Sequence, residues 1–259
     1  MTNYNTITYR IDSGITTITL NRPNRFNAFS SEMRTELLSA LNQAKDDESC
    51  RVIILTGEGK AFCAGQDLKD IEDDVDFEHI LKKGYNPLIQ CMRSLPKPII
   101  GRINGVAAGA GCSLAFACDF IIADNRASFI EAFVSIGLVL DSGSSYFLPR
   151  LAGSTRSFEL ATMGSTLTAD KAYEWGMINR AVDIASLDDE VQKIAHFYAN
   201  APTKAIGMIK EMLNRSSHST LTDMLSLEST FQVEAGQTQD FREGVSAFLE
   251  KRKPNFKGE

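Results

Sequence analysis

The segment Ile99–Pro149 constrains the fold and the chemistry of this chain more than any other stretch. It opens with the apolar run Ile99–Ile103, passes through the small residues of Asn104–Gly111, and continues as an apolar run to Ala117. This order predicts a strand, a tight turn and the N-terminus of a helix. The backbone N–H groups in the first turn of such a helix lack partners within it, and small side chains let a ligand oxygen approach them closely.

A single acid, Asp141, follows between the apolar stretch Gly137–Leu140 and the turn residues Ser142–Gly143. Amide groups that attract negative charge, together with an acid in an apolar setting, suit chemistry that passes through an enolate. Each feature also has a structural alternative. The glycines could serve only to pack a helix closely on a strand, and Asp141 could be the N-cap of the next helix. The sequence alone leaves both alternatives open.

Length and composition indicate a globular protein with a sizeable core. The chain has 259 residues, of which 43% are hydrophobic and 23% charged, enough for one domain or a domain with an appendage. Its net charge of −6 gives no support for nucleic acid or a membrane surface as a partner. No apolar run approaches the ~18 residues of a membrane helix, and Met1–Tyr4 does not begin a signal peptide. We therefore expect a cytoplasmic protein.

The cysteines and histidines give no indication of a metal site. The 5 cysteines are odd in number and lie mostly in apolar contexts, which favours buried free thiols over disulfides. The 3 histidines are far apart and lack the spacing of metal ligands. We expect no bound metal.

Taken in order, the chain predicts a repeated strand, strand, helix pattern. Ile7–Ile11 and Ile15–Leu20 have the form of a hairpin, and an amphipathic helix capped by Ser30 or Ser31 follows. Val52–Gly57 is apolar throughout, as a parallel strand covered on both faces should be. The pattern recurs further on, which predicts an α/β fold built of β-β-α turns. The acidic stretch Asp70–Phe77 has no period and predicts a loop.

The end of the chain is predicted to be helical. We expect residues 1–199 to form the body with the site, and residues 200–259 to form a helical region too small to stand alone. The last helix is predicted to open at Asp240, with Glu243 completing a capping box.

Several stretches carry a family resemblance when they are taken together. They are Asn21–Pro23, Ala61–Leu68, Pro96–Ile99 with Asn104–Gly111, and Glu243–Arg252. In this order and spacing they identify the chain as a member of the crotonase, or enoyl-CoA hydratase/isomerase, superfamily over essentially its whole length. The resemblance implies a β-β-α spiral with a C-terminal helical trimerisation region, assembled as a homotrimer or hexamer. It also implies an acyl-CoA thioester substrate, with CoA present as part of that substrate and no separate cofactor.

The resemblance also implies roles for particular residues. Members of the family hold the enolate oxygen with two backbone N–H groups, which at the matching positions belong to Gln66 and Ala110. The CoA part is held by residues that match six positions in this chain. They are Arg25, Ala64, Asp67, Leu68, Phe248 and Lys251. For the two basic residues, an ordinary solvated surface charge is the alternative.

Two departures from the family pattern favour one kind of reaction. Hydratases carry glutamates at the positions of Ser113 and Phe133, and neither residue can replace a carboxylate that activates water. Asp141 falls where isomerase-like members carry an aspartate. One acid can move a proton between two carbons, so we expect an acyl-CoA isomerase. A hydratase with an atypical site and a non-catalytic binding protein of the same fold are the alternatives, and the retained Asp141 counts against the second.

Overall fold

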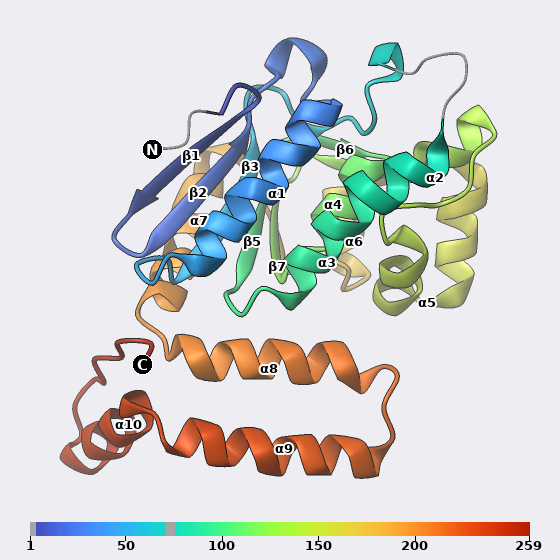
Figure 1. Ribbon diagram of the computed structural model, residues 1–259. Coiled ribbons are helices and arrows are strands. Elements are labelled where there is room, and N and C mark those ends of the chain that lie inside the picture. The colour runs from blue at the N-terminus through green and yellow to red at the C-terminus, as the bar shows by residue number, and fades with distance from the viewer. Residues whose placement is uncertain (1–3, 71–75) are drawn as a thin grey trace.

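The computed structural model of the chain describes residues 4–70 and 76–259 (Figure 1). Most of the acidic stretch predicted as a loop, residues 70–77, therefore lies outside the described residues. The strands are β1 Ile7–Asp12, β2 Ile15–Leu20, β3 Val52–Gly57, β4 Ala61–Cys63, β5 Ile99–Ile103, β6 Val106–Ala108, β7 Phe120–Asp124, β8 Ser128–Ile130, β9 Thr166–Thr168 and β10 Arg180–Val182.

Helices follow most pairs of strands. The α-helices are α1 Ser31–Asp46, α2 Phe77–His79, α3 Asn86–Ser94, α4 Ala110–Phe116, α5 Ser144–Met163, α6 Ala169–Glu174, α7 Ile184–Ala199, α8 Thr203–Ser216, α9 Leu221–Gly236 and α10 Gln239–Glu250. Shorter helical turns are the 3₁₀ segments η1 Pro23–Arg25, η2 Leu68–Asp70 and η4 Ala132–Ile136, and the π-helical segment η3 Ile80–Tyr85.

The strands form two sheets that the chain visits in alternation. The larger sheet has the order β1-β2-β3-β5-β7-β10 and the smaller one β4-β6-β8-β9. From β3 to β8, the first strand of each pair joins the larger sheet in parallel and the second joins the smaller one. The chain thus winds as a spiral of β-β-α turns, and the prediction of an α/β spiral is confirmed.

The first elements form for the local reasons that the sequence indicates. Ile7 pairs with Leu20 and Asp12 with Ile15 in an antiparallel hairpin. The hydroxyl of Ser30 accepts the N–H of Met33 at 3.1 Å and caps α1. All six residues of β3 are buried, as expected of a strand with parallel neighbours on each side.

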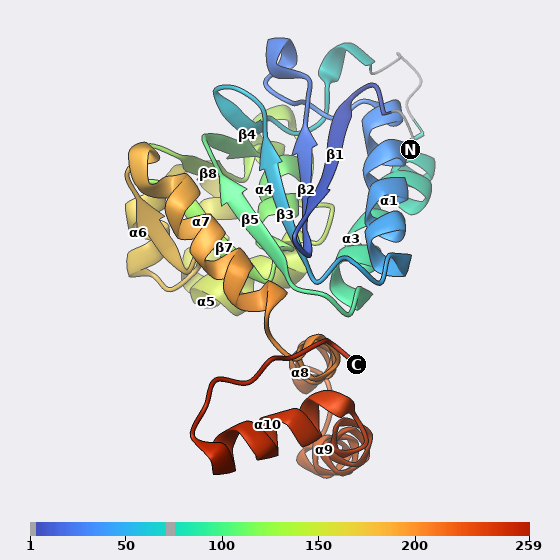
Figure 2. The same cartoon turned by 90° about the vertical axis from the view of Figure 1, so that its left-hand side faces the viewer.

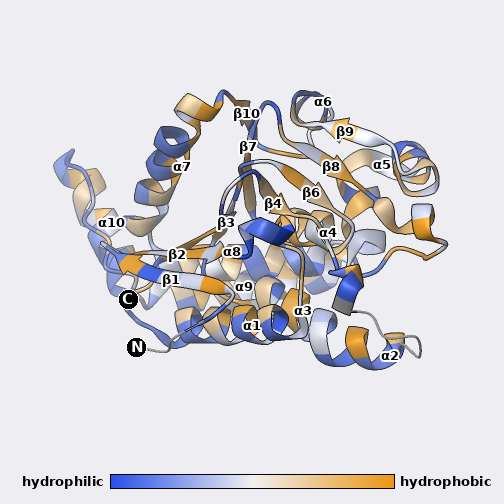
Figure 3. Ribbon diagram, turned by 90° about the horizontal axis from the view of Figure 1, so that it is seen from above, coloured by the Kyte–Doolittle hydropathy of each residue, from blue (hydrophilic) through white to orange (hydrophobic). Residues whose placement is uncertain are grey.

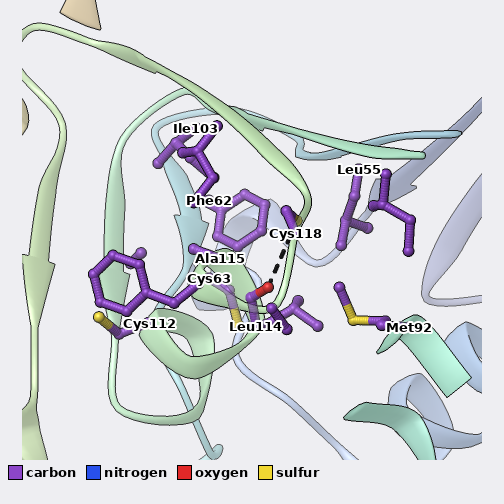
Figure 4. Close-up of a cluster of buried hydrophobic side chains, with 14 of the residues drawn as sticks. Leu55, Phe62, Cys63, Met92, Ile103, Cys112, Leu114, Ala115 and Cys118 are labelled. Carbon is purple, nitrogen blue, oxygen red and sulfur yellow. Dashed lines mark hydrogen bonds between the residues drawn. The ribbon is translucent and has the colours of Figure 1, made fainter. Parts of the chain in front are cut away.

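The core of the body lies between the sheets and the helices that cover them. Seen from above, the central strands are mostly orange, whereas α1 and α7 alternate between blue and orange as amphipathic helices do (Figure 3). Phe62 of β4, Ile103 of β5 and Leu114 of α4 are fully or almost fully buried and lie in one cluster (Figure 4). This packing fixes the turn after β4 against the N-terminus of α4.

The helices α8, α9 and α10 lie together below the body (Figures 1 and 2). The prediction for the start of α10 is wrong, because Thr238 is the N-cap and its hydroxyl accepts the N–H of Phe241 at 3.0 Å. Asp240 instead accepts the N–H groups of Lys257 and Gly258, and thereby anchors the C-terminal tail. No helix within residues 4–70 and 76–259 is long and apolar enough to cross a bilayer.

Candidate active site

A pocket of about 220 Å³ lies where the turn after β4, the start of α4 and the helical segments η3 and η4 meet. Most of its walls are apolar. Its lining residues are Ala64, Gly65, Gln66, Leu68, Phe77, Ile80, Leu81, Tyr85, Gly109, Ala110, Ala132, Phe133, Ser135, Ile136, Leu138 and Asp141. Among the site residues predicted from the sequence, the pocket brings together Gln66, Ala110, Asp141, Ala64 and Leu68.

The backbone of Gln66 is held so that its N–H group stays available. Phe29 donates its N–H to Gly65 at 2.7 Å and accepts the N–H of Asp67 at 3.0 Å, as in a short parallel bridge. In that pattern the N–H of the residue between points away from the bridge. Within residues 4–70 and 76–259, the N–H of Gln66 has no hydrogen-bond partner.

The second available N–H belongs to Ala110, the first residue of α4. Gly109 precedes it with a φ of 51° and donates its own N–H to Ile130 at 2.9 Å. As the first helical residue, Ala110 has no acceptor one turn earlier in its own helix, and no other partner for its N–H lies in the described chain.

Glycines bring these two turns into contact. A Cβ on Gly65, whose φ is 91°, would lie 2.7 Å from the carbonyl oxygen of Ala108 and 3.6 Å from the nitrogen of Ala110. A Cβ on Gly111 would lie 2.1 Å from the carbonyl oxygen of Cys63. The packing alternative is therefore right for Gly111, and this packing is also what places the N–H groups of Gln66 and Ala110 in one pocket.

The side chain of Gln66 is held by two residues that the sequence analysis missed. The guanidinium of Arg34 and the hydroxyl of Tyr85 each donate to Gln66 Oε1 at 2.7 Å. Arg34 also lies over the Tyr85 ring, 4.8 Å from its centroid. Gly84 leaves room for Arg34, because a Cβ there would lie 2.8 Å from Arg34 Nε. These contacts cross three separate elements, so no local pattern points to them.

Asp141 lies in the pocket wall and caps no helix. The N-cap of α5 is Gly143, and no side chain caps that end. The N-cap alternative for Asp141 is therefore wrong. Burial raises the pKa of the Asp141 carboxyl, and the hydroxyl of Ser142, which donates to Asp141 Oδ1 at 2.7 Å, offsets part of that rise.

The two positions where hydratases carry glutamates have other functions here. Ser113 is fully buried, and its hydroxyl lies 2.7 Å from that of Ser144. Phe133 contributes an apolar wall. Among the described residues that line the pocket, Asp141 is the only acid. A second buried acid, Glu131, lies behind the wall. It directly follows the strand Ser128–Ile130 and precedes apolar residues, and this position is the signal in the sequence that could have indicated a buried acid.

The residues predicted to hold CoA fall into two groups. Arg25 ends η1, and the next residue, Phe26, accepts the N–H of the pocket residue Ala64 at 3.0 Å, so Arg25 is one residue away from this contact. Asp67 is buried and forms an ion pair with Arg22 at 3.0 Å. The other group, Phe248 and Lys251, is exposed at the end of α10, which lies below the body beside α9 (Figures 1 and 2). Within one chain, this second group does not reach the pocket.

Comparison with known proteins identifies the family. The model of the enoyl-CoA hydratase/isomerase family matches residues 10–259. The chain belongs to this family. The crotonase resemblance and fold class predicted from the sequence are thereby confirmed, and the protein is an enzyme of that family.

Individual crotonases differ in the reactions for which they are named. The chain is 45% identical over 253 residues to 1,2-epoxyphenylacetyl-CoA isomerase of Escherichia coli, covering 96% of this chain and 97% of that protein. It is 34% identical over 257 residues to trans-2-decenoyl-[acyl-carrier-protein] isomerase of Streptococcus mutans, covering 97% and 98%. The crystal structure of enoyl-CoA hydratase from Bacillus anthracis superposes with a TM-score of 0.94 at 33% identity, covering 98% and 100%.

Proposed function

We propose that this crotonase is an acyl-CoA isomerase in which Asp141 moves a proton while the N–H groups of Gln66 and Ala110 hold the enolate oxygen. The observation that carries the proposal is the pocket itself, in which one acid and two available N–H groups share apolar walls. Burial makes the Asp141 carboxylate a stronger base than a surface aspartate. Preorganised donors at the oxyanion contribute roughly 3 to 4 kcal/mol each.

The reaction on a 3-enoyl-CoA needs no group beyond these. The Asp141 carboxylate takes a proton from C2, and the electron pair moves onto the thioester oxygen, where the two N–H groups donate. The protonated Asp141 then returns its proton to C4, and the double bond shifts from C3–C4 to C2–C3. The substrate and the product have the same atoms, which suits a site with a single acid.

The apolar walls favour a substrate with a hydrocarbon or aromatic acyl group. Leu68, Ile80, Leu81, Phe133 and Leu138 surround the space beside Asp141. We propose two reactions for a cytoplasmic enzyme, isomerisation of 2-(1,2-epoxy-1,2-dihydrophenyl)acetyl-CoA and isomerisation of Δ3- to Δ2-enoyl-CoA. The first is supported by the likeness to the Escherichia coli isomerase.

A panel of CoA thioesters tests the proposed reaction class. We expect turnover of the epoxyphenylacetyl thioester or of a 3-enoyl-CoA, and only trace hydration of crotonyl-CoA, because Ser113 and Phe133 supply no second carboxylate for water. Absorbance of the conjugated enoyl thioester follows both reactions. Efficient hydration of crotonyl-CoA would show that the enzyme is a hydratase with an atypical site.

We also propose that the chain works as a homotrimer or hexamer. Large apolar residues on α8, α9 and α10 are exposed in the single chain, and α9 has no buried residue. They include Ile209, Leu213, Leu221, Leu225, Val233, Phe241, Phe248 and Leu249. Apolar surface of this extent marks an interaction site. Phe248 and Lys251 lie on this surface, and the assembly is where they would meet CoA.

Neutralising the charges proposed for CoA should change substrate binding more than turnover. We expect Arg25→Ala and Lys251→Ala each to raise KM for an acyl-CoA by about tenfold, with kcat within about twofold, because the phosphates are remote from the reacting carbons. Lys171→Ala, which removes an exposed lysine on α6, is the matched control.

Sedimentation of the same three variants and the wild type completes this experiment. All four proteins should sediment as the same trimer or hexamer. Unchanged KM in both Arg25→Ala and Lys251→Ala would remove these residues from the CoA site, and a wild-type chain that sediments as a monomer would contradict the proposed assembly.

A further inference from the structure

Glu131 is a buried acid that the proposed reaction does not use. Its side chain is 3% exposed, and its Oε2 atom has no hydrogen-bond partner among the described residues. Its Oε1 atom lies 3.1 Å from the hydroxyl of Ser144. Burial makes an ionised carboxylate costly in this position. The hydrogen bonds of Ser144 and of the Cys112 thiol offset only part of that cost, so the neutral acid is tolerated better. Burial raises the pKa of Glu131 to about 7.

A line of hydrogen-bond contacts connects Glu131 to the backbone of Asp141. From Glu131 the line runs to the Ser144 hydroxyl, then over 2.7 Å to the Ser113 hydroxyl, and then over 3.1 Å to the carbonyl oxygen of Asp141. Glu131, Ser144 and Ser113 are all buried.

The hydrogen-bond contacts between Glu131 and the Asp141 carbonyl need more hydrogens than the two serine hydroxyls carry. Three contacts need three hydrogens, and each serine hydroxyl has one to donate. The third can come only from the carboxylic acid of Glu131, which then donates to Ser144, Ser144 to Ser113, and Ser113 to the Asp141 carbonyl. When Glu131 is ionised, one of the three contacts holds no hydrogen and two oxygens face each other. The Ser113 hydroxyl also lies 3.4 Å from the Gly109 carbonyl oxygen. This oxygen is a further acceptor, so the contacts outnumber the available hydrogens by one more.

We propose that Glu131 is a positioning residue for Asp141. In its neutral form it supplies the hydrogen that completes the line through Ser144 and Ser113, and so holds the backbone that carries the Asp141 carboxylate. A neutral Glu131 also leaves the Asp141 carboxylate without a second negative charge behind it. This role rests on the proposed function of Asp141.

The role predicts how activity depends on pH. Glu131 is neutral below about pH 7 and ionises above it, so the positioning of Asp141, and kcat with it, should fall as pH rises through about 7. The titratable groups that face Glu131 are Asp141 and the thiol of Cys112 in α4. Burial and the nearby Glu131 raise the pKa of the Cys112 thiol well above its ordinary value, so this thiol stays protonated across the same range.

Two substitutions of Glu131 separate the effect of the hydrogen that it donates from the effect of its negative charge. In Glu131→Gln the amide N–H₂ donates to Ser144 at every pH, so we expect kcat near the wild-type value at pH 6 and no decline near pH 7. Glu131→Met has a similar length and no hydrogen to donate, so kcat should be about tenfold lower at pH 6, with KM within about twofold. Ser113→Ala interrupts the line at its other end and should match Glu131→Met, should that variant fold poorly.

The outcomes distinguish this proposal from the proposed function. A wild-type decline near pH 7 that persists in Glu131→Gln, or a Glu131→Gln variant as impaired as Glu131→Met, overturns the role of Glu131. Infrared spectra of the wild type should show a protonated buried carboxyl that is lost above pH 7 and is missing from Glu131→Gln, and the lack of this band in the wild type also overturns the role. Full activity of Asp141→Asn would instead overturn the proposed function and leave the infrared result standing.

Discussion

Replacing Asp141 by asparagine is expected to reduce kcat for isomerisation by roughly 10³-fold, with the affinity for acyl-CoA nearly unchanged. The amide has the size of the carboxylate but cannot accept the C2 proton. No other acid among the described pocket-lining residues can take over, because Phe133 and Ser113 occupy the positions that carry glutamates in hydratases. Glu131 lies behind the wall and, on our proposal, already holds its own proton.

The measurement is steady-state turnover of a 3-enoyl-CoA and of the epoxyphenylacetyl thioester, with calorimetry for acyl-CoA binding. Asp170→Asn, an exposed acid in the first turn of α6, is a matched control and should keep wild-type activity. Thermal unfolding should show both variants folded. Turnover by Asp141→Asn near the wild-type rate would exclude Asp141 as the proton carrier.

The parts of the candidate site whose placement can be read from the sequence are those that local patterns indicate. Small residues at 64–65 and 108–111 indicate turns that something approaches closely, and the structure places these turns against each other. The sequence places Asp141 next to apolar residues, and burial raises the pKa of its carboxyl, although the neighbouring Val139 is itself 83% exposed. The apolar runs in the sequence predict the strands of the spiral in the same way.

The parts that were missed depend on contacts between distant segments. Arg34 and Tyr85 meet at Gln66 from α1 and η3, and neither their spacing nor their surroundings in the sequence indicate that meeting. Asp240 has the residue type of an N-cap, and Thr238 also does. The choice between them is made by the chain end, whose N–H groups at Lys257 and Gly258 occupy the Asp240 carboxylate.

Substituting Gly65 by alanine is the second change for which we expect a large effect on turnover. Gly65 has a φ of 91°, and an added Cβ would lie 2.7 Å from the Ala108 carbonyl oxygen. Alanine therefore strains the backbone at the residue just before Gln66 and pushes the turn at 64–66 away from the start of α4. The two N–H groups then no longer converge on one oxygen. Loss of one such donor lowers kcat by about 10²- to 10³-fold.

The strain should also cost about 1 to 3 kcal/mol of unfolding free energy, so turnover is measured well below the unfolding temperature. Gly236→Ala is the matched control, because it adds the same methyl group in α9, where nothing lies within 4 Å and φ is not positive. That variant should keep wild-type kcat. A shift of the turn at 64–66 against the start of α4 must weaken the two hydrogen bonds that Gln66 and Ala110 donate to the enolate oxygen, because both share this single acceptor. A folded Gly65→Ala enzyme with kcat within about twofold of the wild type would therefore mean that the enolate oxygen is not held between these two N–H groups.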